Sequence, residues 1–244
     1  MSLFQQIVSD LQSRANPEKK LVLQRFFKTA PGQYGEGDVF LGVIVPDQRI
    51  VAKKYYQVAD FGVVERLLAS PIHEYRLTAL IVLTYQFPKV ELEKKQALFD
   101  FYLGQTAKIN NWDLVDLSAP NIVGEYMLAT KLDMMRLRTL VQSSLLWERR
   151  ISIIATLAFI RAVKKGLVGS EWLQPSLVLA KILLTDKQDL MHKAVGWVLR
   201  EVGKADERLL IEFLDKHYLQ IPRTALRYSI ERFDDSLRKQ YLRK

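Results

Sequence analysis

The segment from Asn110 to Glu125 contains the residues best suited to chemistry, because it places an acid where comparable positions elsewhere carry a base. Trp112 and Asp116 are four residues apart, so on a helix they share one face and lie one turn from each other. A carboxylate among cations weakens the binding of phosphate, so its presence indicates a role other than affinity. The pattern predicts a site that attracts a polyanion and then acts on it.

Asp116 begins one of a series of similar short sequence motifs, each a charged residue followed by small and aliphatic ones. The other motifs begin at Arg49, Arg76, Arg150, Lys193 and Arg223. Positions 76, 116, 150, 193 and 223 are separated by 40, 34, 43 and 30 residues, an irregular repeat typical of stacked helical pairs. If the pairs align these positions along one basic concave face, their cations are predicted to contact phosphates, and Arg150 is also expected to affect turnover. These cations are Arg76, Arg150, Lys193 and Arg223.

Three of the four tryptophans accompany these positions. Trp112 stands near Asp116, Trp147 near Arg150, and Trp197 near Lys193. Aromatic faces pack against sugars or bases while cations meet phosphates, so the combination is more specific than charge alone. Two structural alternatives stay open: the tryptophans are core residues, or Asp116 forms a salt bridge with Arg150.

Residues 29–44 hold four of the eleven glycines and are predicted to form a shaped loop rather than a helix. The loop is either a connector or a backbone-rich surface that presents Tyr34 to a phosphate. No Gly-Lys-Ser/Thr follows, which argues against a nucleotide P-loop.

Other chemistries lack their parts. The chain has no cysteine, so disulfides, thiolate metal sites and cysteine nucleophiles are excluded. His73, His192 and His217 have no metal-ligand spacing and are each interpreted as a surface or satisfied histidine. There is no Gly-x-Ser-x-Gly elbow of a serine hydrolase. We therefore expect no metal and no cofactor.

The chain of 244 residues carries a formal net charge of +9 and has a pI near 9.6, which favours a polyanionic partner. No secretory leader opens the sequence, and no apolar run reaches the roughly 18 residues of a membrane span. We therefore expect a cytoplasmic protein that makes no membrane contact.

The hydrophobic periodicity predicts helices almost throughout and no convincing strand. Ser2 is a plausible cap of the first helix, and Pro120 requires a kink or break between Asp116 and Asn121. Short loops between helices are typical of antiparallel pairs stacked into an all-α, HEAT-like helical repeat solenoid, here one domain of residues 1–244. The predicted helices span 3–14, 17–28, 47–57, 61–68, 71–86, 90–108, 112–129, 132–142, 144–164, 171–184, 189–203, 206–217 and 222–233.

Over nearly its whole length the sequence resembles the AlkD-like family of DNA alkylation repair glycosylases, which are built from HEAT-like repeats. The resemblance rests on Phe-Phe-Lys-Thr-Ala-Pro-Gly-Gln-Tyr-Gly-Glu-Gly-Asp followed by Phe-Leu-Gly-Val, on Asn-Asn-Trp-Asp-Leu-Val-Asp ending at Asp116, on Trp-Glu-Arg-Arg ending at Arg150, and on Lys-Ala-Val-Gly-Trp-Val-Leu-Arg-Glu starting at Lys193. One departure is that Leu190 and Met191 stand where the family has aromatic residues before the Gly-Trp pair.

The resemblance implies hydrolysis of the N-glycosidic bond of cationic N3- or N7-alkylated purines in duplex DNA, without a tight pocket for a flipped base. It implies that Asp116 is the catalytic carboxylate, that Trp112 and Trp197 pack against the deoxyribose and backbone, and that Arg150 holds a phosphate. We expect a monomer. Two alternatives do not need Asp116. A non-catalytic scaffold for nucleic acid or protein needs only the basic face, and in a pure protein-interaction solenoid the basic charge is incidental.

Overall fold

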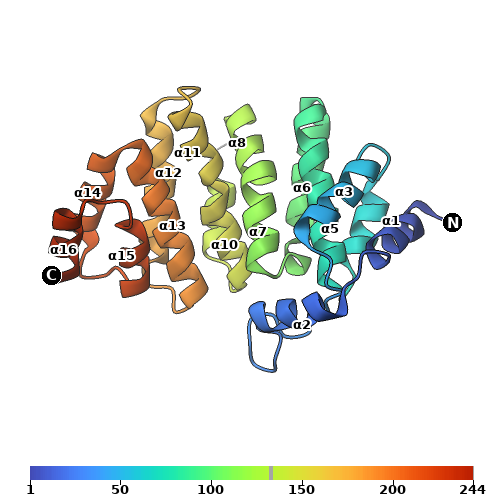
Figure 1. The fold of residues 1–244 in the computed structure, drawn as a ribbon. Helices are drawn as coiled ribbons and strands as arrows, with labels where there is room; N and C mark the ends of the chain where they lie inside the picture. The colour runs from blue at the N-terminus through green and yellow to red at the C-terminus, as the bar shows by residue number, and fades with distance from the viewer. Residues whose placement is uncertain (132–133, 244) are drawn as a thin grey trace. The chain divides into compact units, whose positions relative to one another are not determined.

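The computed structural model describes residues 1–131 and 134–243, which group into two compact units, Met1–Ile122 and Val123–Lys244. Within these described ranges the chain is mainly helical (Figure 1). Val39 and Ile72 form an isolated parallel β-bridge. The all-α prediction is confirmed, and the succession of helices is consistent with a helical repeat fold. That the whole chain acts as one domain stays a prediction.

The first unit runs from the blue to the green part of the chain in Figure 1. It contains α1 (Leu3–Gln12), α2 (Pro17–Phe26), α3 (Val45–Tyr55), α4 (Phe61–Leu68), α5 (His73–Gln86), η1 (Phe87–Lys89), α6 (Leu92–Gly104), η2 (Thr106–Lys108) and α7 (Trp112–Ala119).

At the centre of this unit lies α5, which contacts α1, α3, α4 and α7. Every residue from His73 to Leu83 is buried, as expected for a helix that is surrounded by others on all sides. Its first turn nevertheless carries His73, Glu74 and Arg76, three charged or titratable side chains that burial obliges to find partners.

The chain passes into the second unit within η3 (Pro120–Gly124), a π-helical turn that begins where α7 ends. Pro120 has no N–H to continue the ladder of α7, and the α-helical hydrogen bonding ends there, in keeping with the kink or break expected at this proline. The second unit contains α8 (Glu125–Thr130), α9 (Met135–Val141), α10 (Leu146–Ala155), α11 (Leu157–Lys164), η4 (Ser170–Leu173), α12 (Gln174–Leu183), α13 (Asp189–Ala205), α14 (Glu207–His217), α15 (Arg223–Ser229) and α16 (Asp235–Arg243).

The recurrent short motifs that begin with a charged residue each lie on a separate helix. In the first unit they begin on α3, α5 and α7, and in the second on α10, α13 and α15. Within each unit the successive members of these sets contact each other, while the helices between them fall outside the series. The irregular sequence repeat therefore corresponds to a structural one.

Several helix boundaries follow from caps. Ser2 and Gln5 form a reciprocal capping box at the start of α1, which confirms the expected cap. The predicted helix 144–164 is divided at Thr156 into α10 and α11, and α16 was not predicted. The first two residues of the predicted helix 132–142 lie outside the described residues, and the remainder corresponds to α9.

No helix in the described part of the chain is both long and apolar enough to span a bilayer.

Candidate active site

The short helix α7 positions Trp112 and Asp116. Asn111 is its N-cap, and the Asn111 Oδ1 atom accepts a hydrogen bond from the backbone N–H of Trp112 at 2.8 Å. Trp112 and Asp116 are both half-buried and lie one turn apart, while Leu114, Val115 and neighbouring residues fill the core. The expected spacing of the indole and the carboxylate on one short helix is therefore present.

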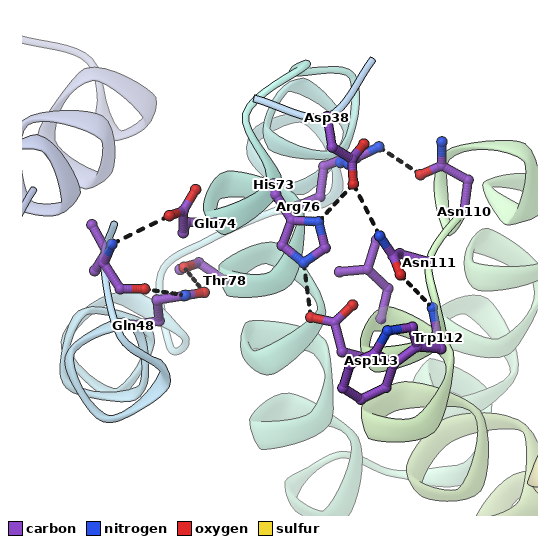
Figure 2. Close-up of polar contacts among 12 residues, drawn as sticks. Asp38, Gln48, His73, Glu74, Arg76, Thr78, Asn110, Asn111, Trp112 and Asp113 are labelled. Carbon is purple, nitrogen blue, oxygen red and sulfur yellow. Dashed lines mark hydrogen bonds and ion pairs between the residues drawn. The ribbon is translucent and has the colours of Figure 1, made fainter. Parts of the chain in front are cut away.

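Next to Trp112, Asp113 belongs to a buried polar network (Figure 2). The Nε2 atom of His73 lies 2.8 Å from Asp113 Oδ2, and its Nδ1 atom lies 2.9 Å from Asp38 Oδ2. Asp38 comes from the loop before α3, His73 from the first turn of α5, and Asp113 from the first turn of α7. One imidazole ring thus joins three segments that are 35 and 40 residues apart in sequence.

Arg76 and the two asparagines before α7 complete the network. The Arg76 guanidinium pairs with Asp38 Oδ1 and also donates to the side-chain oxygen of Asn110. Asn111 Nδ2 donates to Asp38 Oδ2 at 3.1 Å (Figure 2). Asp38 therefore receives hydrogen bonds from His73, Arg76 and Asn111 together, which is the dense satisfaction that a buried carboxylate requires.

The charged partners in the network shift the pKa values of His73 and Asp38 in the direction that favours their charged forms. Burial alone would lower the pKa of His73, but hydrogen bonds and charges from Asp113 and Asp38 raise that pKa to about 9. Burial alone would raise the pKa of the Asp38 carboxyl, and hydrogen bonding and charge from His73 and Arg76 hold it below its usual value. His73 is therefore an imidazolium at neutral pH.

A second buried carboxylate fixes the loop between α2 and α3. Glu74 accepts hydrogen bonds from the backbone N–H groups of Leu41, Gly42 and Val43 at 2.8–3.2 Å. Gly42 has φ +86°, and a Cβ atom there would come within 2.0 Å of the Asn16 carbonyl oxygen, so only glycine fits. The glycine-rich segment is thus a shaped structure held against α5, and it delivers Asp38 to the network.

Aromatic rings from the end of α2 cover Trp112. Its indole stacks on Phe27 at 5.3 Å between ring centroids with 14° between planes, and meets the edge of Phe26 at 5.9 Å. Phe26 is 60% exposed. Tyr34, predicted to approach a phosphate, is half-buried and donates its hydroxyl hydrogen to the Phe26 carbonyl at 3.2 Å. Tyr34 and Trp112 are therefore neighbours of the same residue.

Arg76 does not lie on the surface, where its predicted phosphate contact would require it to be. It is 5% exposed, and its guanidinium is engaged by Asp38 and Asn110. Arg76 occupies the position in the helical repeat that the sequence predicted, but Asp38 and Asn110, from distant segments, accept hydrogen bonds from its guanidinium. A phosphate could reach this guanidinium only if the network opened, so Arg76 has a structural role in this fold.

In the second unit, α10 and α13 carry Arg150, Lys193 and Trp197. Arg150 is 5% exposed and donates from Nη1 to the Leu190 carbonyl at 2.6 Å, which ties α10 to the start of α13. Lys193 pairs with Asp189 at 2.6 Å, and Trp197 lies one turn further along, half-buried. Arg223, at the start of α15, is exposed and donates to the Leu242 carbonyl.

The residue types around Trp197 have local structural causes. A Cβ atom on Gly196 would come within 2.5 Å of both the Ala225 carbonyl oxygen and Tyr228 Cβ, so glycine permits α13 and α15 to touch. Met191, at a position where the resembled family has an aromatic residue, is fully buried. Leu190 contributes its carbonyl to Arg150.

No group of three or more histidine, aspartate or glutamate side chains in the described ranges could hold a metal ion. The sequence pattern indicated no role for Asp38 or Asp113 and only a surface or satisfied histidine at position 73, although the structure joins the three residues beside Trp112. The available signal was weak: a histidine, a glutamate and an arginine within the first four residues of a helix that is mainly apolar after them.

A family described as DNA alkylation repair enzyme matches residues 7–233 of the chain. Among solved structures, a predicted DNA alkylation repair enzyme from Enterococcus faecalis is 17% identical, with a TM-score of 0.66 and coverage of 91% of this chain and 98% of that chain. The smu.31 protein from Streptococcus mutans UA159 is 18% identical, with a TM-score of 0.56 and coverage of 88% and 98%. These likenesses concern the fold. No curated protein sequence matched the chain.

Proposed function

This chain belongs to the DNA alkylation repair enzyme family, and from that premise we propose that it is a DNA glycosylase acting on cationic N3- or N7-alkylated purines in duplex DNA. Membership gives a role in DNA alkylation repair and a DNA partner. The glycosylase activity, the alkylpurine substrate and the residue roles are the content of the proposal.

One observation carries the proposal: Trp112 and Asp116 share α7 one turn apart, and neither is enclosed in the core. Three polar residues close to them in the sequence, Asn110, Asn111 and Asp113, take part in the buried network. An indole and a carboxylate beside each other are what a reaction that develops positive charge on a sugar requires.

The chemistry follows from the charge of the lesion. Alkylation at N3 or N7 makes the purine cationic, so it departs as a neutral base and needs little acid catalysis. Positive charge then appears on the deoxyribose, where the Asp116 carboxylate stabilises it and aligns or deprotonates the attacking water. Because the sugar is more positive in the transition state than in the ground state, Asp116 binds the transition state preferentially.

The remaining residues hold the DNA. Electron-rich faces of Trp112 and Trp197 pack against the sugar and backbone, with cation–π attraction of about 0.5–2 kcal/mol each for a cationic deoxyribose. Lys193 and Arg223 contribute positive charge to the contact with the DNA backbone. Arg150 is as buried as Arg76, so its proposed phosphate contact requires the guanidinium to turn outward from the Leu190 carbonyl. Uncharged lesions are expected to be poor substrates, because selectivity comes from the instability of the alkylated nucleotide itself.

The test is incubation of the full chain with methylated duplex DNA, followed by chromatography of the released bases. Release of 3-methyladenine or 7-methylguanine, with none from unmethylated DNA, supports the glycosylase. Binding without release would indicate the nucleic-acid scaffold instead. Neither binding nor release would favour a protein-interaction solenoid.

A further inference from the structure

The imidazole of His73 has a carboxylate oxygen at each of its two nitrogens. A neutral imidazole carries one N–H and one lone pair, so it could donate to only one of Asp38 and Asp113. The two carboxylate oxygens, at 2.9 and 2.8 Å from the ring nitrogens, both receive a hydrogen bond from the ring only when it is doubly protonated. With Arg76 on the other oxygen of Asp38, the cluster contains two cations and two anions and is neutral as a whole.

His73 is itself excluded from the reaction, because it is 1% exposed and both ring nitrogens are engaged. Its connection to the candidate residues runs along two short routes. By hydrogen bonding it holds Asp113, the residue directly after Trp112 in the first turn of α7. By ring contact it lies 4.8 Å from Phe27, which in turn stacks on the indole of Trp112 at 5.3 Å.

The attachment of α7 at this point depends strongly on His73. The other oxygen of Asp113, Oδ1, is buried and has no hydrogen-bond partner within the described part of the chain. A carboxylate in that position is stable only while the cation beside it remains. Because α7 has only eight residues, holding its first turn also fixes the direction of Asp116 one turn later.

We infer that His73, as a protonated bridge between Asp38 and Asp113, is a positioning residue that holds Trp112 and Asp116 in the orientation the reaction needs. For its effect on excision the inference rests on the proposed function. Its structural part, the coupling of the His73 charge to the orientation of Trp112, stands independently of that function.

Loss of the proton has a definite consequence. A neutral His73 turns a ring lone pair toward one carboxylate, so one of its two hydrogen bonds becomes a repulsion. The charged groups that face it are Asp38 from the loop and Asp113 from α7, with Arg76 of α5 held on Asp38, while Glu74 is turned toward the loop amides. Phe27 and Phe40 cover the ring faces and do not titrate.

The structural test is ¹⁹F NMR of the full chain labelled with 5-fluorotryptophan, which gives one signal for each of the four tryptophans. We expect the Trp112 signal, assigned by its loss in Trp112→Phe, to shift with a midpoint near pH 9. The other three signals should not share this transition. In His73→Gln the transition should disappear, whereas in the control His217→Gln, on α14, it should persist.

The functional test is single-turnover excision of 7-methylguanine from a duplex between pH 7 and 9.5, corrected for loss without enzyme. We expect the wild-type rate to fall above about pH 9 and the His73→Gln rate to be lower at pH 7.5 by about 10–100-fold, without the alkaline fall. Binding of the duplex at pH 7.5 should change less than the excision rate, because the backbone contacts proposed for Lys193 and Arg223 do not involve His73.

The two proposals fail differently. If the wild type released no alkylpurine at any pH, the proposed function would be wrong, while the Trp112 signal would still decide the positioning role. A Trp112 signal that is independent of pH, in a wild type whose His73 ring titrates, would overturn the inference. So would a His73→Gln variant with the wild-type rate and pH profile. If that variant failed to fold, the wild-type titration would decide.

Discussion

At the scale of single residues, the segment Asn110–Asp116 divides its side chains between two duties. Asn110, Asn111 and Asp113 turn into the buried network and attach α7 to α5 and to the loop before α3. Trp112 and Asp116 remain half-buried one turn apart. A sequence pattern that looks like one motif thus combines the fixing of a helix with the presentation of two groups for chemistry.

The tryptophans allow a comparison of function with stability. We expect Trp112→Ala and Trp197→Ala to reduce excision strongly while lowering the free energy of unfolding by only about 1–2 kcal/mol. Each indole is half-buried, and Trp112 loses chiefly its stacking on Phe27. Trp172→Ala is the control, because Trp172 contacts Phe159 and has no assigned role.

Chemical denaturation and single-turnover excision, measured on the same three variants, distinguish the two explanations. A loss of about 3–5 kcal/mol in both Trp112→Ala and Trp197→Ala would identify these residues as core. Trp172→Ala should keep the wild-type excision rate at a temperature where it is folded.

Residue types and periodicity were enough to predict the pairing of Trp112 with Asp116 on one helix. They were insufficient for Arg76, because its burial depends on Asp38 and Asn110, which lie 38 and 34 residues away. The role of His73 was missed for the same reason. Which carboxylates enclose a histidine is decided by packing between segments, and no local pattern contains that information.

At the scale of elements, the first turn of α5 fastens the glycine-rich loop. We expect Glu74→Gln to lower the free energy of unfolding by about 2–3 kcal/mol, because the carboxylate accepts three backbone N–H groups and an amide nitrogen would face donors instead. Glu93→Gln is the matched control: Glu93 is also the second residue of its helix, α6, but is exposed.

Denaturant unfolding of both variants checks this prediction. The control retains any general effect of losing a negative charge near a helix N-terminus, which is about 0.3–1 kcal/mol. Equal losses in the two variants would show that the contacts of Glu74 with the loop add nothing.

The raised pKa of His73 predicts how stability depends on pH. Since the ordinary pKa is 6.5 and the folded value is about 9, the folded chain binds this proton more tightly than the unfolded chain. The stabilisation is therefore complete below pH 6.5 and is lost as pH rises to about 9, a change on the order of 3 kcal/mol. Unfolding experiments across this range should give a steeper decline for wild type than for His73→Gln, and parallel curves would contradict it.

Element boundaries were predictable where local chemistry sets them, as at Ser2 and Pro120. The division at Thr156 was not, because apolar periodicity continues through it and the Thr156 hydroxyl donates to the Ile153 carbonyl inside the helical run. The loop 29–44 was recognised as shaped from its glycines. Its attachment through Asp38 and Glu74 depends on partners more than 30 residues distant.

At the scale of the whole molecule, the net charge of +9 and the series of cations predict binding to duplex DNA that is sensitive to salt and largely independent of sequence. With about three phosphate contacts, affinity should fall tens-fold between roughly 50 and 200 mM salt. Titrations of an unmodified duplex at several salt concentrations measure this slope, and a flat dependence would contradict the prediction.

Variants of two arginines, one exposed and one buried, add a specific comparison to the salt titration. Arg223 is exposed, so Arg223→Gln should reduce the salt slope by about one. Arg76 is enclosed by the network, so Arg76→Gln should leave the slope unchanged and lower stability. An unchanged slope in Arg223→Gln together with a reduced slope in Arg76→Gln would reverse the assignment.

The all-α repeat was predictable from the sequence. The hydrophobic periodicity extends over many helical turns, and the short motifs that begin with a charged residue recur on separate helices. The roles of individual residues are harder to predict from the sequence, since they depend on the chemistry and surroundings of single side chains. The basic concave face and the monomeric state stay predictions.

The most direct test of the central claim is single-turnover excision of 7-methylguanine from a duplex by Asp116→Asn, beside its thermal melt and its affinity for the same duplex. The substitution keeps the shape of the side chain and removes its negative charge. We expect excision to slow by about 10²-fold or more, equivalent to about 2.7 kcal/mol of transition-state stabilisation, with the fold intact and DNA binding unchanged or tighter. Asp100→Asn, at an exposed position of α6, should behave as wild type. An Asp116→Asn protein that excises at the wild-type rate, or that loses melting temperature and DNA binding together with activity, would contradict the catalytic role of Asp116.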